Sequence, residues 1–96
     1  MEVQFRTRQL ERCFEREAVA VRAWGPIVGQ RYVERVTVII DSPDIQTLYA
    51  QRSLDLHPLT GDRHGQYALR LTGQWRLLIS ISGEIVTIEE VSNHYD

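Results

Sequence analysis

The spacing of apolar residues changes near residue 52, and this change constrains the fold more than any other feature of the sequence. Before it, apolar residues recur at the intervals of helices that bury one face. After it, apolar and polar residues alternate, as in strands that bury one face. Helices followed by strands, rather than a repeated strand–helix order, predict a two-layer α+β domain with a mainly antiparallel sheet.

Local signals place the boundaries of these elements. Thr7 is a candidate N-cap for the first helix, and Gly25-Pro26 ends that helix. Ser42-Pro43-Asp44 has the order of an N-cap, a first-turn proline and a first-turn acid. The second helix is rich in β-branched residues, which also suit a strand. The predicted elements are a strand at 3–5, helices at 7–24, 27–40 and 42–49, and strands at 53–57, 67–71, 75–81 and 85–91.

Length and composition restrict the class of protein. The chain has 96 residues, a formal charge of −2 and a 43% hydrophobic share, which fit a single domain over residues 1–96. No apolar run approaches the roughly 20 residues of a membrane span, and the first residues lack the apolar stretch of a secretory signal. Cys13 is the single cysteine, so no internal disulfide can form and the expected compartment is the cytoplasm.

All eleven basic residues are arginine, and lysine is absent. Seven of them lie within residues 1–50 beside seven acids, and we interpret them as solvated charges on helix faces. Residues 51–76 hold the other four with two acids, which gives a local charge of +2. Codon bias is the simplest explanation of the missing lysine, but the positions of the arginines matter, because a guanidinium binds phosphate through paired, planar hydrogen bonds. The four central arginines are Arg52, Arg63, Arg70 and Arg76.

A predicted β-hairpin brings two of these arginines together. If Thr72-Gly73-Gln74 is a three-residue loop, Arg70 lies opposite Arg76 on the polar face. Two guanidiniums side by side repel each other unless an anion or an acid lies between them. The pair is therefore either a clamp for phosphate or is neutralised by Glu89 or Glu90 on the next strand. The sequence leaves both interpretations open.

Groups that can transfer protons lie near the same face. His57 is predicted to project from its strand on the side of the arginines, and histidine exchanges protons near neutral pH. The loop at 56–65, with two glycines and Arg63, is either a cradle of backbone N–H groups for an anion or a plain turn. The C-terminal His94 and Tyr95 add two further groups, although polar chain ends often fray.

Three segments, in this order and spacing, resemble the RelE/ParE toxin superfamily, and most closely its HigB-like, plasmid-maintenance killer branch. They are residues 56–67, which include His57-Pro58-Leu59, residues 73–77 and residues 90–95. The resemblance covers nearly the whole chain. It implies a RelE-like fold, with an N-terminal strand and two helices packed on a curved, mainly antiparallel sheet whose open face carries the active site.

Two positions depart from the pattern of this family. Thr60 stands where many relatives have lysine. The stretch Ser92-Asn93-His94-Tyr95 stands where the family's tail commonly reads Glu-Asp-Tyr-His, so an acid is lost and the two ring residues exchange places. Both departures, together with the acidic net charge, count against vigorous catalysis.

The resemblance also implies a function. It is that of a type II toxin that cleaves mRNA on the ribosome without a metal or other cofactor. A HigA-like helix-turn-helix antitoxin would neutralise it, and only through that antitoxin would it contact operator DNA. The hypothesis assigns catalysis to His57, Arg76, His94 and Tyr95, and binding of RNA phosphates to Arg63, Arg70 and Asn93.

The alternative is a non-catalytic binding module of the same fold. It would be either a ParE-like gyrase poison or an inactive toxin homologue that acts with an antitoxin as co-repressor. The charge of −2 and the absence of lysine favour this alternative, whereas the histidines beside the arginines favour the nuclease.

Overall fold

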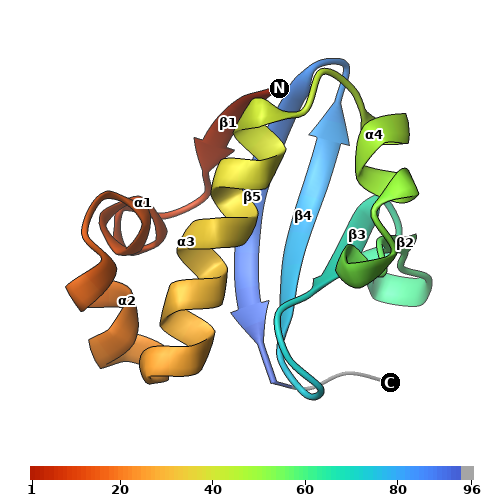
Figure 1. The fold of residues 1–96 in the computed structure, drawn as a ribbon. Helices are drawn as coiled ribbons and strands as arrows, with labels where there is room; N and C mark the ends of the chain where they lie inside the picture. Colours follow the sequence, from red (N-terminus) through yellow and green to blue (C-terminus); the bar gives the residue numbers. More distant parts are fainter. Residues whose placement is uncertain (94–96) are drawn as a thin grey trace.

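A computed structural model describes residues 1–93 as helices that cover one face of a five-stranded sheet (Figure 1). The helices are α1 (Arg8–Glu15), α2 (Glu17–Trp24), α3 (Pro26–Asp41) and α4 (Ile45–Ala50), with single 3-10 turns η1 (Arg52–Leu54) and η2 (Gly61–Arg63). The strands are β1 (Glu2–Phe5), β2 (His57–Pro58), β3 (Gln66–Arg70), β4 (Arg76–Ser82) and β5 (Ile85–Ser92).

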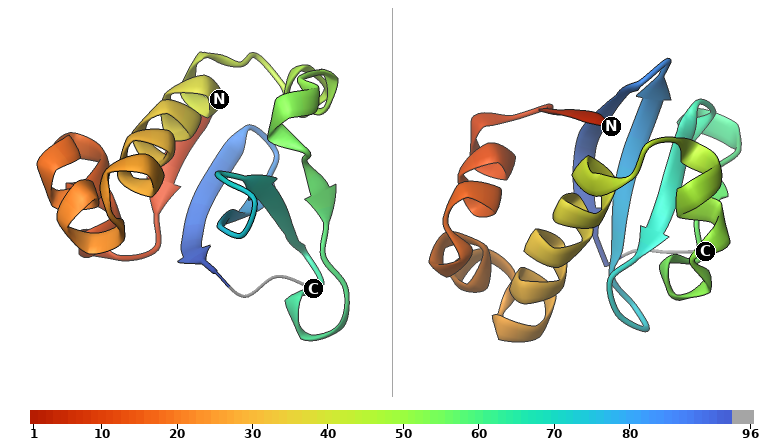
Figure 2. Two further views of the ribbon diagram at one scale, coloured as in Figure 1. Left: turned by 60° about the horizontal axis from the view of Figure 1, so that its bottom comes forward. Right: turned by 45° about the horizontal axis from the view of Figure 1, so that its top comes forward.

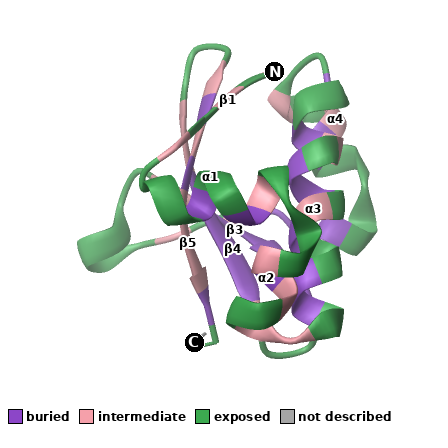
Figure 3. Ribbon diagram, turned by 90° about the vertical axis from the view of Figure 1, so that its left-hand side faces the viewer, coloured by how far each residue is buried: buried purple, intermediate pink, exposed green. Residues whose placement is uncertain are grey.

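The sheet has the strand order β1-β5-β4-β3-β2. Strand β1 runs parallel to β5, and the other neighbours are antiparallel, so the predicted mainly antiparallel sheet is confirmed. Helices α3 and α4 lie on one side of the sheet, as the turned views in Figures 2 and 3 show. The two-layer α+β architecture predicted from the change in apolar spacing is therefore confirmed.

The hydrophobic core lies between α3 and the sheet. Tyr32 and Val36 of α3 are fully buried against the apolar face of the strands, and the Tyr32 hydroxyl donates to Leu10 O at 2.7 Å. Burial raises the pKa of Tyr32, so this hydroxyl stays a hydrogen-bond donor. None of the helices in residues 1–93 is both long and apolar enough to cross a membrane. The buried strand residues of the core are Leu69, Leu77, Ile79, Val86 and Ile88.

The predicted single helix at 7–24 is wrong, because the chain breaks into two helices at Arg16. Arg16 has extended backbone angles (φ −135°, ψ 106°), and its N–H caps α1 by donating to Arg12 O. A straight helix over both segments would be about 25 Å long, close to the full 30 × 28 × 24 Å of the domain. The break folds the chain back, so that Cys13 and Ala20 are both buried. The predicted cap at Thr7 is confirmed, since its Oγ1 accepts from Leu10 N at 3.1 Å.

The helix predicted at 27–40 is α3, which begins one residue earlier than predicted, at Pro26. Gly25 has a φ of 88°, and Pro26 occupies the first turn of α3. At the other end the predicted cap was wrong by two residues. Ser42 ends α3, with its Oγ donating to Val38 O at 2.7 Å, and Asp44 is the N-cap of α4, accepting from Thr47 N at 2.9 Å. The hydrogen bonds from the Thr47 backbone N–H and from Thr47 Oγ1 lower the pKa of Asp44.

The predicted strand at 53–57 is largely wrong. Only His57–Pro58 pairs with β3, and the preceding residues form the η1 turn. Leu54 and Leu56 are buried as expected, but the residue between them, Asp55, is left-handed (φ 49°). This conformation, rather than a strand, turns both leucines into the core.

Helices α2 and α3 pack unusually closely at Gly29. A Cβ atom at this position would lie 2.7 Å from the backbone N of Val21 and 2.8 Å from the backbone C of Ala20. Backbone atoms cannot move aside as the end of a flexible side chain can. Glycine is therefore required here by the contact between the two helices and not by its own backbone angles.

We predict that Gly29→Ala destabilises the domain although alanine is the better helix former. Overpacking of a close contact typically costs about 1–3 kcal/mol, and urea denaturation measures this loss. Gln30→Ala, at the exposed neighbouring position of α3, should change stability by less than about 0.5 kcal/mol. Equal stabilities of the two variants would contradict the close packing of α2 on α3.

Candidate functional site

The strand register arranges the open face of the sheet in rows. Residues directly opposite one another in antiparallel strands project on the same face. One row runs across four strands, from β2 to β5, and the next row runs across three. The first consists of His57, Ala68, Leu78 and Glu90, and the second of Arg70, Arg76 and Ser92.

The predicted opposition of Arg70 and Arg76 is confirmed, as is the loop that causes it. Leu71 N donates to Trp75 O at 3.0 Å and closes the hairpin around Thr72-Gly73-Gln74. The two guanidiniums nevertheless have different surroundings. Arg70 is exposed and forms an ion pair with Asp55 at 3.3 Å, so an acid before β2, rather than Glu89 or Glu90 of β5, neutralises it.

Arg76 is only 5% exposed and holds the hairpin loop together. Its Nη1 donates to Thr72 O at 2.7 Å and to Trp75 O at 3.0 Å. Thr72 O lies in the loop, whereas Trp75 O also accepts from Leu71 N, and one guanidinium can donate to both at once. Arg76 therefore has a structural role at the base of the predicted site.

Two arginines of α3 bind the same hairpin from the other side. Arg31 Nη1 donates to Leu71 O at 3.0 Å, and Arg35 Nε donates to Arg70 O at 3.1 Å. We call Arg31, Arg35 and Arg76 the arginine clamp, because each donates to backbone carbonyls of the β3–β4 hairpin. The interpretation of the first seven arginines as solvated helix charges is wrong for Arg35, which is buried, and incomplete for Arg31.

The β2–β3 loop is a turn whose backbone groups mostly serve the loop itself. Leu59 N donates to Gln66 O, Arg63 N to Thr60 O and His64 N to Gly61 O. Gly61 and Gly65 have positive φ angles of 66° and 95°, which explains why glycine occupies both positions. Of the two interpretations of this loop, the geometry favours the turn over the cradle of free N–H groups.

The Arg63 side chain leaves this loop and reaches β5. Its Nη2 lies 2.9 Å from Glu90 Oε1, and its Nη1 donates to Gln66 Oε1 at 3.2 Å. The predicted phosphate-binding residue thus already has an acid as its partner. Arg63 and Arg70, the two exposed arginines of the predicted site, are both paired with carboxylates of the chain itself.

His57 lies at the edge of the same face. Its Nδ1 is 2.9 Å from Asp55 O, and because a carbonyl oxygen only accepts, we infer that Nδ1 carries the proton. Asn93 is exposed directly after Ser92, which faces Arg76. The predicted His94 and Tyr95 lie outside the described residues. The fold therefore brings His57, Arg70 and Arg76 together on one face.

The sequence pointed to Glu89 and Glu90 as acids near the site but not to their actual partners, and it gave no signal for Asp55. Asp55 and Glu90 pair with Arg70 and Arg63, as described above. Glu89 lies at a β-bulge of β5, where it accepts from Ser80 Oγ at 2.7 Å and pairs with Arg6 at 3.6 Å. Each of these contacts joins residues from different elements, so sequence spacing alone does not reveal them.

Neither a thiol nor a metal ligand set stands out in the described part of the chain. Within residues 1–93, no group of three or more His, Cys, Asp and Glu side chains is placed to hold a metal ion. Cys13 is buried, and burial raises the pKa of its thiol, which disfavours the reactive thiolate.

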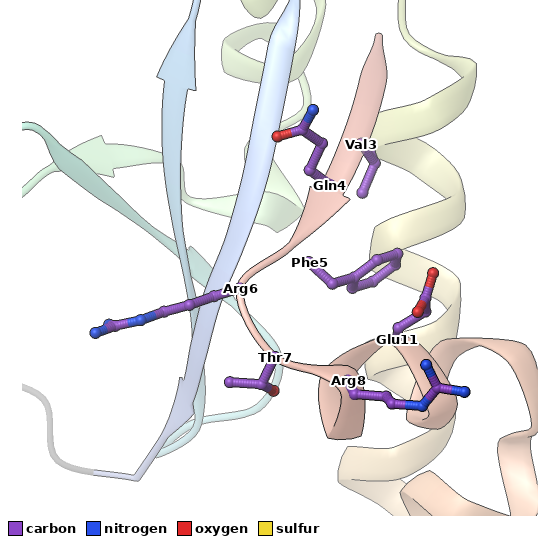
Figure 4. Close-up of a pocket in the computed structure, with 7 residues that line it drawn as sticks. All are labelled: Val3, Gln4, Phe5, Arg6, Thr7, Arg8 and Glu11. Carbon is purple, nitrogen blue, oxygen red and sulfur yellow. The ribbon is translucent and has the colours of Figure 1, made fainter.

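A hollow of about 400 Å³ lies elsewhere, beside β1 and the start of α1 (Figure 4). Figure 4 shows Arg6 pointing across β5, while Phe5 points toward α3. None of the predicted site residues lines it. The lining residues are Val3, Gln4, Phe5, Arg6, Thr7, Arg8 and Glu11.

The arrangement on the open face suits an anion better than a neutral ligand. Exposed ion pairs are weak, so a phosphate can replace Asp55 or Glu90 as the partner of an arginine. His57 is placed at the edge of that face, and its imidazole can donate or accept a proton. The face can therefore bind a phosphodiester and supply one proton-transfer group.

Several solved structures of bacterial proteins are similar to this chain in fold. A histidine-to-glutamine mutant of YafQ from E. coli matches with a TM-score of 0.66 and 15% identity over 95% of this chain and 90% of that one. A chain of the YoeB-YefM complex from Staphylococcus aureus matches with a TM-score of 0.64 and 14% identity over 99% and 98%. The YoeB/ParE toxin from Agrobacterium tumefaciens has a TM-score of 0.57 and 20% identity over 99% and 100%.

At these identities the likeness establishes the fold. The RelE-like fold expected from the sequence resemblance is confirmed, whereas the HigB-like branch stays a prediction. No protein-family model matches the chain, and no curated protein matches it in sequence.

The surroundings of the two opposed arginines predict different effects on stability. Arg76→Ala removes charged, part-buried hydrogen bonds to the carbonyls of the hairpin loop, and we expect a loss of about 1.5–3 kcal/mol. Arg70→Ala removes one exposed ion pair, which contributes about 1 kcal/mol or less. Urea denaturation of both variants measures the difference. Equal losses would show that Arg76 does not support the hairpin.

Proposed function

We propose that this protein is a type II toxin that cleaves mRNA on the ribosome without a metal ion. The observation that carries the proposal is the open face, where Arg70, Arg76 and His57 come together on the sheet of a RelE-like fold. A phosphodiester needs cations to hold it and groups to move protons, and this face supplies both.

The proposed reaction needs only side chains. A base removes the proton of the ribose 2′-hydroxyl, the resulting oxygen attacks the neighbouring phosphorus, and an acid protonates the leaving 5′-oxygen. We assign the acid–base work to His57 and His94 and the stabilisation of phosphoryl charge to Arg76 and Arg70. Tyr95 stacks on a base or assists proton transfer.

Two further residues position the RNA in this proposal. Arg63 orients the backbone from the β2–β3 loop, and Asn93 donates to a phosphate beside the second row of the sheet. Because Arg76 also supports the hairpin, its substitution mixes loss of structure with loss of chemistry. Arg70 is the cleaner probe, since its side chain is 49% exposed.

We further propose that an antitoxin neutralises the protein in the cytoplasm. Support comes from structural neighbours that were crystallised as toxin–antitoxin complexes, YafQ with DinJ and YoeB with YefM. The sequence resemblance favours a HigA-like helix-turn-helix partner, and contact with operator DNA would then run through that partner alone.

A binding module without catalysis is the second candidate. The specific observation in its favour is that both exposed arginines of the site are already paired with acids, in a chain of net charge −2. A protein of this kind would act on a protein target, as a ParE-like gyrase poison, or as a co-repressor with an antitoxin.

Induced expression tests the proposed nuclease. The wild-type protein should arrest growth and cleave transcripts, and Arg70→Ala should relieve both, since losing one preorganised cation lowers a cleavage rate roughly 100-fold. Arg22→Ala, at an exposed position of α2, removes the same charge and should remain toxic. Growth curves and transcript profiles at equal protein abundance measure the effect.

Two results would contradict this assignment. Growth arrest with intact transcripts would support the binding module instead of the nuclease. Equal toxicity of wild type and Arg70→Ala would show that the site lies elsewhere. Salt dependence separates the two classes in vitro, because RNA binding through phosphates weakens steeply with salt.

A further inference from the structure

The ion pair between Arg63 and Glu90 crosses the open face of the sheet. Arg63 belongs to the η2 turn of the β2–β3 loop, and Glu90 belongs to β5. Strands β3 and β4 lie between them in the sheet order β1-β5-β4-β3-β2. The contact therefore ties a loop at one side of the face to a strand on the other side.

Two apolar residues occupy the strands that this contact crosses. Ala68 and Leu78 lie in the same row as Glu90, on the face opposite the helices. They are 0% and 5% exposed, yet they do not belong to the core between α3 and the sheet. The open face thus has a small apolar floor beneath the span of the ion pair.

The ion pair itself is easy to exchange. The side chains of Arg63 and Glu90 are 44% and 41% exposed, so water screens their attraction. A phosphate offers the guanidinium the same planar, two-oxygen contact that the carboxylate offers. Glu90 occupies the place that an RNA phosphate would take beside Arg63.

We propose that Glu90 is a latch that competes with RNA for Arg63 and holds the β2–β3 loop over the open face. Binding of a phosphate to Arg63 releases Glu90, frees the loop and uncovers Ala68 and Leu78 for a nucleobase. The proposal rests on the proposed function, since it assumes that RNA binds this face. Glu90 would then set how tightly a phosphate must bind Arg63 before the loop opens.

As a consequence, the latch would select against RNA that is free in solution. A free strand must displace Glu90 with its own binding energy, whereas a strand held in place by another assembly presents its phosphate at a high effective concentration. The latch therefore suppresses binding of free RNA more than binding of positioned RNA.

Two acid-to-amide variants separate the latch from a general charge effect. Glu90→Gln keeps the shape of the side chain but removes its charge. Glu84→Gln makes the same charge change at the exposed β4–β5 turn, away from Arg63. Amide hydrogen exchange of residues 59–66 should be faster in Glu90→Gln than in wild type and unchanged in Glu84→Gln.

Affinity for a short single-stranded oligoribonucleotide gives the second readout. Glu90→Gln should bind about two- to fivefold more tightly than wild type, the range expected from releasing one exposed ion pair. In an Arg63→Ala background, Glu90→Gln should bring no such gain over Arg63→Ala alone, because there is then no guanidinium for the Glu90 carboxylate to withhold. Glu84→Gln should show a smaller gain that does not depend on Arg63.

The outcomes distinguish this proposal from the proposed function. Unchanged loop exchange in Glu90→Gln, or equal RNA affinities of Glu90→Gln and Glu84→Gln, would overturn the latch. Faster exchange with tighter RNA binding supports it. If no variant binds RNA, the proposed function fails, while faster loop exchange confined to Glu90→Gln would still support Glu90 as the latch of the loop.

Discussion

Hydrogen bonds from guanidiniums to backbone carbonyls fix the hairpin on which the rest of the site depends. Arg31 and Arg35 reach it from α3, and Arg76 closes it from within. A strand shifted by one residue would turn every side chain to the opposite face. With the clamp in place, Leu69 and Leu77 face the core, and the polar rows face away from the helices. Arginine suits this role because its planar guanidinium holds five donors in fixed directions and can donate to several carbonyls at once. The ammonium of lysine is a point charge whose donors rotate.

The charges on the open face are balanced, and the face as a whole is not basic. Asp55, Glu89 and Glu90 each form an ion pair with an arginine. Acids and arginines therefore balance on this face, as they nearly do over the whole chain, whose formal charge is −2. A face of this kind attracts free RNA weakly at long range. In the proposed function, a phosphate binds this face by replacing an internal carboxylate. The acidic composition is therefore compatible with a phosphate site, provided that the ligand is brought to the face rather than gathered from solution.

Sequence patterns predicted the parts of the fold that short-range rules govern. Alternation and a three-residue loop predicted the opposition of Arg70 and Arg76, and local signals predicted the cap at Thr7 and the turn at Gly25-Pro26. The break at Arg16 was not predictable, because Glu-Arg-Glu is a good helical sequence and only packing against α3 requires the chain to fold back. The partners of each arginine were also hidden, since ion pairs such as Arg63–Glu90 join residues far apart in sequence. The candidate site was thus predictable as a set of residues on one face, but not as a set of contacts.

The central claim is that the clamped hairpin presents a phosphate-binding face, and nuclear magnetic resonance tests it most directly. Uniformly ¹⁵N-labelled protein is titrated with a short single-stranded oligoribonucleotide at low salt, and the backbone amide shifts are followed. The largest shift changes should fall on β2, β3 and the β2–β3 loop, with β4 and β5 next and little change on the outer surface of α2. Changes confined to α1 and α2, or to the hollow beside β1, would contradict the central claim.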